Sequence, residues 1–275
     1  MRLGHHTITW GGVVGHPSGV TSAKDLHYLS NGSVLDAVRD IGAAGYAGVE
    51  VFDGNLAALA DRPEPFLRAM ETAGVELVSV YTGANFIYAD VLPDEMAKVR
   101  AACELAARFG AGRLVVGGGA RRAAGVQEED HDRLAAALDR VTDLAADHGL
   151  DASYHPHLGT IVESPDELDR LMERTRIGFC PDTAHLAAGG GDPAELIRRY
   201  PERLQHVHLK DVDLATQTFL PLGLGDLDLR DIVRAIREAE YDSWLVVELD
   251  STPGDPLDAA RTSYEHLVEL LDLPA

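Results

Sequence analysis

Histidine and carboxylate side chains recur at the ends of short apolar runs in the second half of this 275-residue chain. They lie in the motifs YHPHLGT, CPDTAH, HVHLKD and VVELD. One residue from each motif contributes to a set of two imidazoles and two carboxylates: His155, Asp182, His208 and Glu248. Such mixed ligands suit hard or borderline divalent cations such as Mn²⁺, Co²⁺ and Mg²⁺. A lone histidine in a loop is usually only a loop residue, so the chemistry depends on whether the four runs meet in space.

The elements that must position these residues follow from the hydrophobic pattern. Eight apolar, β-rich runs predict eight strands, which cover residues 3–10, 47–52, 76–81, 113–118, 150–155, 177–182, 205–210 and 244–249. Between them, segments such as 33–45, 93–112 and 129–149 have the apolar spacing of amphipathic helices. Eight strand-then-helix units predict an α/β fold, a single-domain (β/α)8 TIM barrel over residues 1–275. A doubly wound open sheet is the alternative, disfavoured because no GxGxxG motif follows the first strand.

In such a barrel the C-terminal ends of the strands meet at one face, where active sites form. The four candidate ligands lie at the ends of the fifth to eighth predicted strands, so we expect them to converge on one metal ion. His206 and His208 alternate along one strand and therefore face the same side. His206 comes earlier in the strand, and we expect it to support the site or pack beneath it.

Two connections between predicted elements are unusual. Residues 11–33 form a long insert before the first helix and are a candidate lid within the barrel. The glycine run at 117–119 follows the fourth strand, and a tight turn is its simplest interpretation. Arg121 and Arg122 behind it are an alternative site for a phosphate or carboxylate, which we disfavour.

Composition excludes several classes of partner. The formal net charge of -21 disfavours nucleic acids and anionic membrane surfaces. The two cysteines, Cys103 and Cys180, do not form a disulfide framework, and the N-terminal residues lack a secretion-signal pattern. We therefore expect a cytoplasmic protein, and a homo-oligomer.

The four motifs, with ITWGG and AGYAGVEVFDGN nearer the N-terminus, resemble the xylose isomerase-like TIM barrels, which include sugar isomerases, ketose epimerases and inosose dehydratases. The resemblance covers nearly the whole chain. It implies that the four candidate ligands hold one divalent metal, with Mn²⁺ or Co²⁺ expected first and Mg²⁺ or Zn²⁺ as alternatives. The epimerases have Glu where this chain has His155. The YHxHxGT pattern and the GGGDP that follows DTAH instead resemble the inosose dehydratase branch.

The resemblance also implies the reaction, which begins with removal of a proton alpha to a carbonyl. Epimerases of this type use two glutamates on the metal as acid and base, whereas Glu248 is the one obvious carboxylate base among the ligands here. We therefore expect inosose dehydratase-like elimination from a keto-inositol or keto-sugar, with isomerisation or epimerisation as the alternative. Lys210, His185 and His157 are candidates for donating a proton or binding the departing oxygen. For Lys210, a structural ion pair with Asp211 is the alternative.

Five residues near the ends of the first three strands are candidates for substrate binding: His6, Trp10, Glu50, Asp53 and Tyr81. His6 and Trp10 are expected to form a wall against which a sugar ring packs. The other three are expected to bind hydroxyl groups. For each of the five, packing at the rim or capping of a turn is the alternative.

Three functions of other kinds would also use parts of this pattern. A non-catalytic sugar-binding barrel is disfavoured by the full ligand set. A catalytic subunit of a keto-C-glycoside lyase would use the same metal and the same elimination, together with a partner chain. An endonuclease with three metals would need more ligands and a basic groove, against which the net charge of -21 argues.

Overall fold

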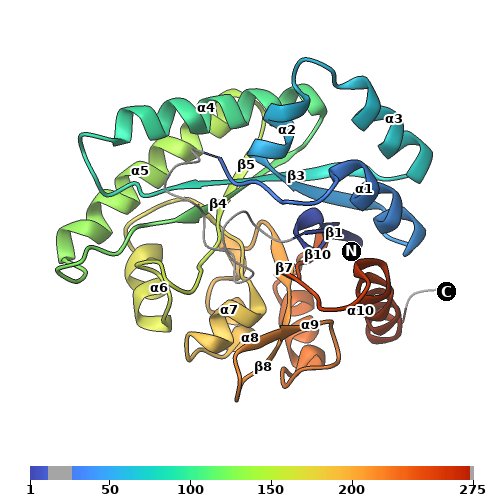
Figure 1. The fold of residues 1–275 in the computed structure, drawn as a ribbon. Helices are drawn as coiled ribbons and strands as arrows, with labels where there is room; N and C mark the ends of the chain where they lie inside the picture. The colour runs from blue at the N-terminus through green and yellow to red at the C-terminus, as the bar shows by residue number, and fades with distance from the viewer. Residues whose placement is uncertain (12–26, 273–275) are drawn as a thin grey trace.

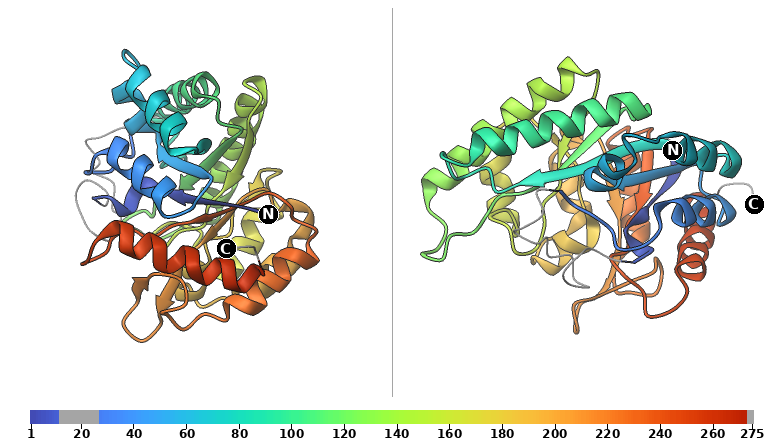
Figure 2. Two further views of the ribbon diagram at one scale, coloured as in Figure 1. Left: turned by 90° about the vertical axis from the view of Figure 1, so that its right-hand side faces the viewer. Right: turned by 45° about the horizontal axis from the view of Figure 1, so that its top comes forward.

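Eight parallel strands curl around a common axis in the computed structural model, which describes residues 1–11 and 27–272 (Figures 1 and 2). Their order is β6-β5-β4-β3-β2-β1-β10-β7. The strands are β1 (Arg2–His6), β2 (Gly48–Phe52), β3 (Glu76–Ala84), β4 (Arg113–Gly118), β5 (Asp151–Tyr154), β6 (Gly178–Phe179), β7 (Val207–Leu209) and β10 (Trp244–Val247). The circle closes between β6 and β7 through two parallel bridges, Phe179 with Leu204 and Asp182 with His208. The predicted (β/α)8 barrel is therefore confirmed, and all eight predicted strands are present.

Helices follow the strands and cover the outside of the barrel (Figure 2). They are α1 (Val34–Ala43), α2 (Asp53–Leu59), α3 (Glu64–Ala73), α4 (Leu92–Phe109), α5 (Glu128–Asp147), α6 (Pro165–Met172), α7 (Thr183–Ala188), α8 (Pro193–Arg199), α9 (Leu229–Glu238) and α10 (Pro256–Leu271). Two short 3-10 helices, η1 (Thr7–Thr9) and η2 (Pro201–Arg203), lie at bends of the chain.

The helix ends carry local sequence signals. Helices α4 and α5 are followed by Gly110 at φ 84° and Gly149 at φ 72°, a left-handed conformation that glycine adopts without strain. Helix α6 begins with a capping box in which Ser164 and Glu167 satisfy each other's backbone N–H groups. These signals return the chain to the next strand after each helix.

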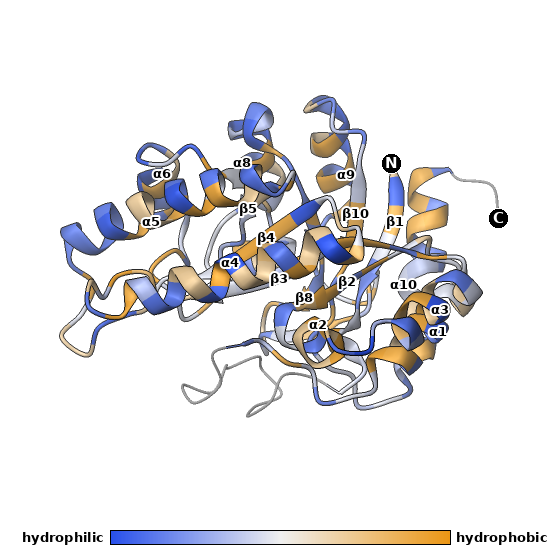
Figure 3. Cartoon of the chain, turned by 90° about the horizontal axis from the view of Figure 1, so that it is seen from above, coloured by the Kyte–Doolittle hydropathy of each residue, from blue (hydrophilic) through white to orange (hydrophobic). Residues whose placement is uncertain are grey.

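The hydrophobic core lies mainly between the strands and the surrounding helices. Strand β4 is hydrophobic along much of its length, whereas α5 alternates hydrophobic and hydrophilic residues (Figure 3). A second, smaller cluster of buried side chains fills the barrel itself and includes Phe52, Tyr81, Val115 and Cys180. Its aromatic rings contact imidazoles near the strand ends, with centroids 4.5 Å apart for Phe52 and His6 and 5.4 Å apart for Tyr81 and His155, so apolar and polar groups pack side by side inside the barrel.

One feature of the structure is not predicted from the sequence, and one sequence prediction falls largely outside the described residues. Strands β8 (Asp211–Asp213) and β9 (Thr218–Leu220) form an antiparallel hairpin after β7 that the hydrophobic pattern does not predict. The candidate lid at 11–33 falls largely on residues 12–26, which lie outside the described part of the chain. Among the described residues, no helix is long and apolar enough to span a membrane.

Candidate metal centre

The strand ladders bring the ends of β5, β7 and β10 to one level. The backbone N–H of His155 donates to the carbonyl of Val116, which continues the pairing of β5 with β4 by one residue. In the same way, the N–H of His208 donates to Pro181, and that of Glu248 to Leu209. Asp182 is bridged to His208 across the closure of the barrel. The four residues therefore occupy neighbouring positions at the C-terminal ends of the strands.

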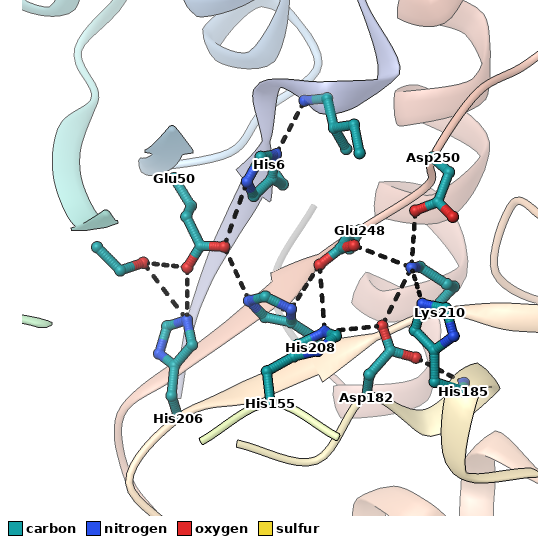
Figure 4. Close-up of polar contacts among 12 residues, drawn as sticks. His6, Glu50, His155, Asp182, His185, His206, His208, Lys210, Glu248 and Asp250 are labelled. Atoms are coloured by element: carbon teal, nitrogen blue, oxygen red, sulfur yellow. Dashed lines mark hydrogen bonds and ion pairs between the residues drawn. The ribbon is translucent and has the colours of Figure 1, made fainter. Parts of the chain in front are cut away.

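One atom of each of these four side chains points to a common centre (Figure 4). The atoms lie within 4.8 Å of one another and are buried: His155 Nε2, Asp182 Oδ2, His208 Nδ1 and Glu248 Oε2. His155 Nε2 lies 3.4 Å from Asp182 Oδ2 and 3.7 Å from Glu248 Oε2. His208 Nδ1 lies 2.5 Å from Glu248 Oε2.

The arrangement of these atoms fits a bound cation. None of the four has an aligned hydrogen bond within the described residues, although all are removed from water. Buried polar atoms without hydrogen bonds cost free energy, and the two carboxylates repel each other, although Lys210 Nζ lies 3.1 Å from Asp182 Oδ2. A divalent cation at their centre would satisfy all four at once. Two imidazole nitrogens and two carboxylate oxygens form a donor set suited to a borderline divalent ion.

The electrostatics of the group show how strongly these side chains interact. Burial alone would lower the pKa of His208, but the charges of Glu50 and Glu248 raise it to about 10. Burial would raise the pKa of Glu248, but Lys210 and His208 hold it well below its usual range. The carboxylate is thus ionised at neutral pH, whereas a metal at Nδ1 of His208 would have to displace a proton.

Lys210 lies beside this group in a cage of carboxylates (Figure 4). Its buried Nζ is 2.9 Å from Glu248 Oε1, 2.8 Å from Asp250 Oδ1 and 3.1 Å from Asp182 Oδ2. These charges raise its pKa well above the usual value, against the opposing effect of burial. Burial also raises the pKa of Asp250, to about 6, although Lys210 lowers it.

The alternative that Lys210 pairs with Asp211 is not found. The Asp211 carboxylate instead accepts hydrogen bonds from backbone N–H groups of the hairpin region, including those of Gly223 and Gly225. Successive residues of a strand point to opposite faces, so Lys210 turns into the barrel mouth and Asp211 away from it. Asp211 thereby anchors the segment that follows β9.

Three rings lie next to the centre. The imidazoles of His157 and His185 have centroids 3.8 Å apart, and Phe219 of β9 lies 4.9 Å from His185. His157 Nδ1 is 2.7 Å from the carbonyl of Leu158, so as a donor there it leaves Nε2 for another partner. Burial and the charge of His155 lower the pKa of His157 to about 4, so its imidazole is neutral at neutral pH. His185 accepts a hydrogen bond from Lys210 at 3.3 Å.

The five residues predicted to bind substrate do not lie together at the rim. Glu50 and His6 are buried below the centre, and the carboxylate of Glu50 contacts His206 and His208. Tyr81 packs edge to face on His155 with ring centroids 5.4 Å apart. Tyr81 therefore borders the candidate ligands, whereas Glu50 and His6 approach them from beneath.

Trp10 and Asp53 are positioned differently from the prediction. The indole N–H of Trp10 donates to Asp40 of α1, and its ring joins the outer core, so it does not form a wall with His6. Asp53 is buried, accepts hydrogen bonds from Thr82 and two backbone N–H groups, and pairs with Lys98 at 3.2 Å. The Asp53 carboxylate thus already has protein partners in place of the predicted substrate hydroxyl.

Gly117 and Gly118 end β4 and still pair with β3, and the N–H of Gly119 donates to Ala84 of β3, so the glycine run extends the strand where a tight turn was predicted. Gly118 and Gly119 have φ of 114° and 94°, and a Cβ on Gly118 would lie 2.0 Å from the carbonyl oxygen of Ala84. Both following arginines are engaged by carboxylates. Arg122 bonds to Asp130, and Arg121 pairs with Glu163 and Glu167. Neither is a free anion-binding group.

Three residues beside the centre are absent from the sequence prediction. Asp250 lies two residues after Glu248. Because residues two apart in a strand face the same side, the sequence could have placed Asp250 beside Glu248. Ser79 donates a hydrogen bond to Glu50 across two neighbouring strands. Phe219 reaches the site only through the unpredicted hairpin, and no local signal in the sequence marks it.

Comparison with known proteins places this geometry in a family. Residues 37–270 match the family model described as xylose isomerase-like TIM barrel. The inosose dehydratase of Geobacillus kaustophilus is 30% identical over 281 residues, which cover 89% of this chain and 88% of that protein. The inosose dehydratase of Lacticaseibacillus casei is 31% identical over 169 residues, covering 54% and 57%. For the latter relative and several others, the match thus spans little more than half of their length.

Solved structures show the same fold at low identity. The probable 3-DHS dehydratase AsbF of Bacillus anthracis superposes with a TM-score of 0.78 at 15% identity, covering 98% of this chain and 99% of that one. The IolI protein, whose structure contains a zinc atom, superposes with a TM-score of 0.77 at 15% identity, covering 99% and 98%.

Proposed function

The chain belongs to the xylose isomerase-like TIM barrel family, and from this premise we propose that it is a divalent-metal-dependent lyase of the inosose dehydratase type. It would remove the proton alpha to the carbonyl of a keto-inositol or keto-sugar and eliminate a hydroxyl group from the neighbouring carbon. Two independent findings support this assignment: the curated relatives named inosose dehydratase and the donor set at the mouth of the barrel.

The observation that carries the proposal is the convergence of four buried donor atoms from four strand ends, none of which has an aligned hydrogen bond within the described residues. His155, Asp182, His208 and Glu248 would hold the metal, with Mn²⁺ or Co²⁺ as the preferred ions and Mg²⁺ or Zn²⁺ as alternatives. A bound cation polarises a carbonyl and stabilises the negative charge that develops when the alpha proton leaves. Glu248 is the one member of the set with measurable exposure, at 5%, and so faces the substrate side.

Glu248 is the candidate base. Its carboxylate takes the alpha proton, the bond to the departing hydroxyl breaks with its electron pair, and a carbon–carbon double bond forms. The departing oxygen takes up a proton from the Lys210–Glu248 pair, whose members lie 2.9 Å apart, and leaves as water. The pair is then back in its starting charge state, so the reaction consumes no other reactant.

Whether the substrate loses water or is epimerised depends on how many basic groups flank the reacting carbon. Epimerisation needs a proton to be removed from one face of a carbon and returned to the other, which calls for two groups. This chain carries His155 where the epimerases have a glutamate, and that imidazole is buried between Asp182 and Glu248. A single carboxylate base therefore favours elimination over epimerisation.

The test is a proton-exchange screen in D2O. The Mn²⁺ or Co²⁺ protein is incubated with keto-inositols, ketohexoses and keto-glycosides, and deuterium uptake, enone absorbance and products are followed by NMR and ultraviolet spectroscopy. We expect exchange alpha to the carbonyl and an unsaturated or dicarbonyl product from a keto-inositol. An epimerised or isomerised product alone would refute the dehydratase assignment and leave metal-assisted enolisation in place.

Replacing His157 with alanine should slow water loss by roughly 2–10-fold and leave metal binding unchanged. The ring is part-buried, and with Nδ1 near the Leu158 carbonyl its Nε2 is the free partner for a substrate hydroxyl. Loss of one such hydrogen bond costs roughly 0.5–1.5 kcal/mol. Metal content and steady-state rates of His157→Ala and His155→Ala are compared. Loss of metal in the first with retention in the second would reverse the two assignments.

We propose a cytoplasmic homo-oligomer acting on a small keto-sugar or keto-inositol. A keto-C-glycoside lyase subunit would copurify with a partner chain and cleave a keto-glycoside in the same screen. A sugar-binding barrel without activity would bind these ligands without deuterium exchange.

A further inference from the structure

Glu50 lies at the centre of a buried polar cluster beneath the candidate metal ligands (Figure 4). Its Oε2 accepts a hydrogen bond from the hydroxyl of Ser79 and lies 3.1 Å from Nε2 of His206. Its Oε1 lies 2.9 Å from Nε2 of His208 and 3.5 Å from Nε2 of His6. Each of these side chains is removed from solvent. The two carboxylate oxygens therefore have different partners: one is anchored in the barrel wall and the other faces a candidate ligand.

The contact with His208 involves the ring nitrogen on the far side from the metal group. Nε2 faces Glu50, while Nδ1 points to the centre shared with His155, Asp182 and Glu248. A carboxylate beside one nitrogen of a ligating imidazole keeps the proton there, fixes the ring orientation and makes the other nitrogen a stronger donor. We infer that Glu50 is a positioning residue that holds His208 with Nδ1 directed at the metal. This inference rests on the proposed function, because it assumes that the group binds a divalent ion.

Two other roles for Glu50 fit the contacts less well. A substrate hydroxyl would have to reach a carboxylate that is fully buried, with Oε2 already bonded to Ser79 and His206 beside it. A second metal ion held by Glu50, His206 and His208 would need Nε2 of His208 while Nδ1 serves the first ion. That ring would then bridge two metals as an imidazolate, with no proton left for Glu50.

The test compares the metal affinity of wild type and Glu50→Gln. Glutamine keeps the volume but removes the charge that holds the proton on Nε2. We expect the dissociation constant for Zn²⁺, measured by competition with a chromogenic chelator, to rise about 10–100-fold. The visible absorption bands of the Co²⁺ protein should also shift, because the ring of His208 is no longer held in one orientation.

Asp130→Asn is the matched control for buried charge. Asp130 is also fully buried and paired, with Arg122 and Arg133, but it lies at the start of α5. Its replacement should lower the melting temperature and leave Zn²⁺ affinity and the Co²⁺ spectrum unchanged. An equal loss of affinity in both variants would show that Glu50 acts only through general stability and would overturn the inference.

A measurement on the wild-type protein does not depend on a variant folding. In Zn²⁺-loaded protein labelled with ¹⁵N-histidine, long-range proton–nitrogen NMR should show one ring with metal on Nδ1 and a proton on Nε2, strongly downfield. Wild-type affinity in Glu50→Gln, or two Zn²⁺ ions per chain, would refute the positioning role while the proposed metal site stands. A wild-type protein that binds no divalent ion would refute both proposals. Metal binding as expected without any exchange in D2O would refute the reaction alone.

Discussion

Replacing Glu248 with glutamine is expected to slow deuterium exchange alpha to the carbonyl by roughly 10²–10⁴-fold, the range for loss of a general base. The amide cannot take the proton, although its oxygen can still face the metal from the position of Oε2. Lys210 keeps its contacts with Asp250 and Asp182, so the cage around it remains. The exchange rate is measured by NMR at saturating Mn²⁺ with the substrate that the screen identifies.

Bound metal, determined in the same Glu248→Gln sample, is the control. Metal content close to wild type together with slow exchange assigns the defect to proton transfer. If exchange continues near the wild-type rate, Glu248 is not the base, and another group at the mouth must be. Loss of metal from this variant would instead show that Glu248 is essential for metal binding.

Replacing Asp182 with asparagine is expected to weaken binding of Mn²⁺ or Co²⁺ by more than about 100-fold, beyond the range for residues that act only through a ligand. Oδ1 of Asp182 caps α7 by accepting from the N–H of His185, and asparagine caps about as well. The change therefore removes a charged donor while keeping the helix start. In wild type, metal at 100 times its dissociation constant should add about 2.7 kcal/mol to the free energy of unfolding. That corresponds to about 5–10 °C in melting temperature for a chain of this size. Calorimetric titration and thermal melts with and without metal measure both effects.

Asp250→Asn is the matched control for this variant. Both carboxylates lie about equally close to Lys210, at 2.8 Å and 3.1 Å, but Asp250 contributes no atom to the four-atom group. The control should retain metal affinity within about tenfold, since it acts only on a neighbour of the ligands. Unchanged metal affinity in Asp182→Asn, or an equal loss in both variants, would show that the ligand assignment is wrong.

The sequence by itself predicted the barrel, because each of its units carries its own local signal. Apolar runs such as 113–118 bury both faces of a central strand, and the helices between them show a period near 3.6. Glycines such as Gly110 and Gly149 end helices in a conformation that other residues adopt only with strain. Since these signals act over a few residues, they could be read without knowing what packs against them.

The convergence of the four candidate ligands was predictable for a related reason. Parallel strands in a closed barrel end at one face, so a residue at the end of a predicted strand has a known height along the axis. His155, Asp182, His208 and Glu248 needed only this rule. Their role as metal ligands remains a proposal, but their proximity is a property of the fold.

Contacts across the barrel were decided by the tertiary structure alone. The alternation along a strand shows which side a residue faces, but not which side chain from a distant strand meets it. The sequence predicts that Glu50 of β2 binds substrate hydroxyls, yet its carboxylate contacts His208 of β7, and the two strands are not neighbours in the sheet. Trp10 was expected at the mouth, but its indole N–H bonds to α1. Lys210 contacts the carboxylates of Asp182 and Glu248, which lie at the ends of β6 and β10. The contact with Asp182 forms because closure of the barrel brings β6 beside β7. These contacts between distant strands depend on how the barrel closes and how its strands are staggered, which no short stretch of sequence determines.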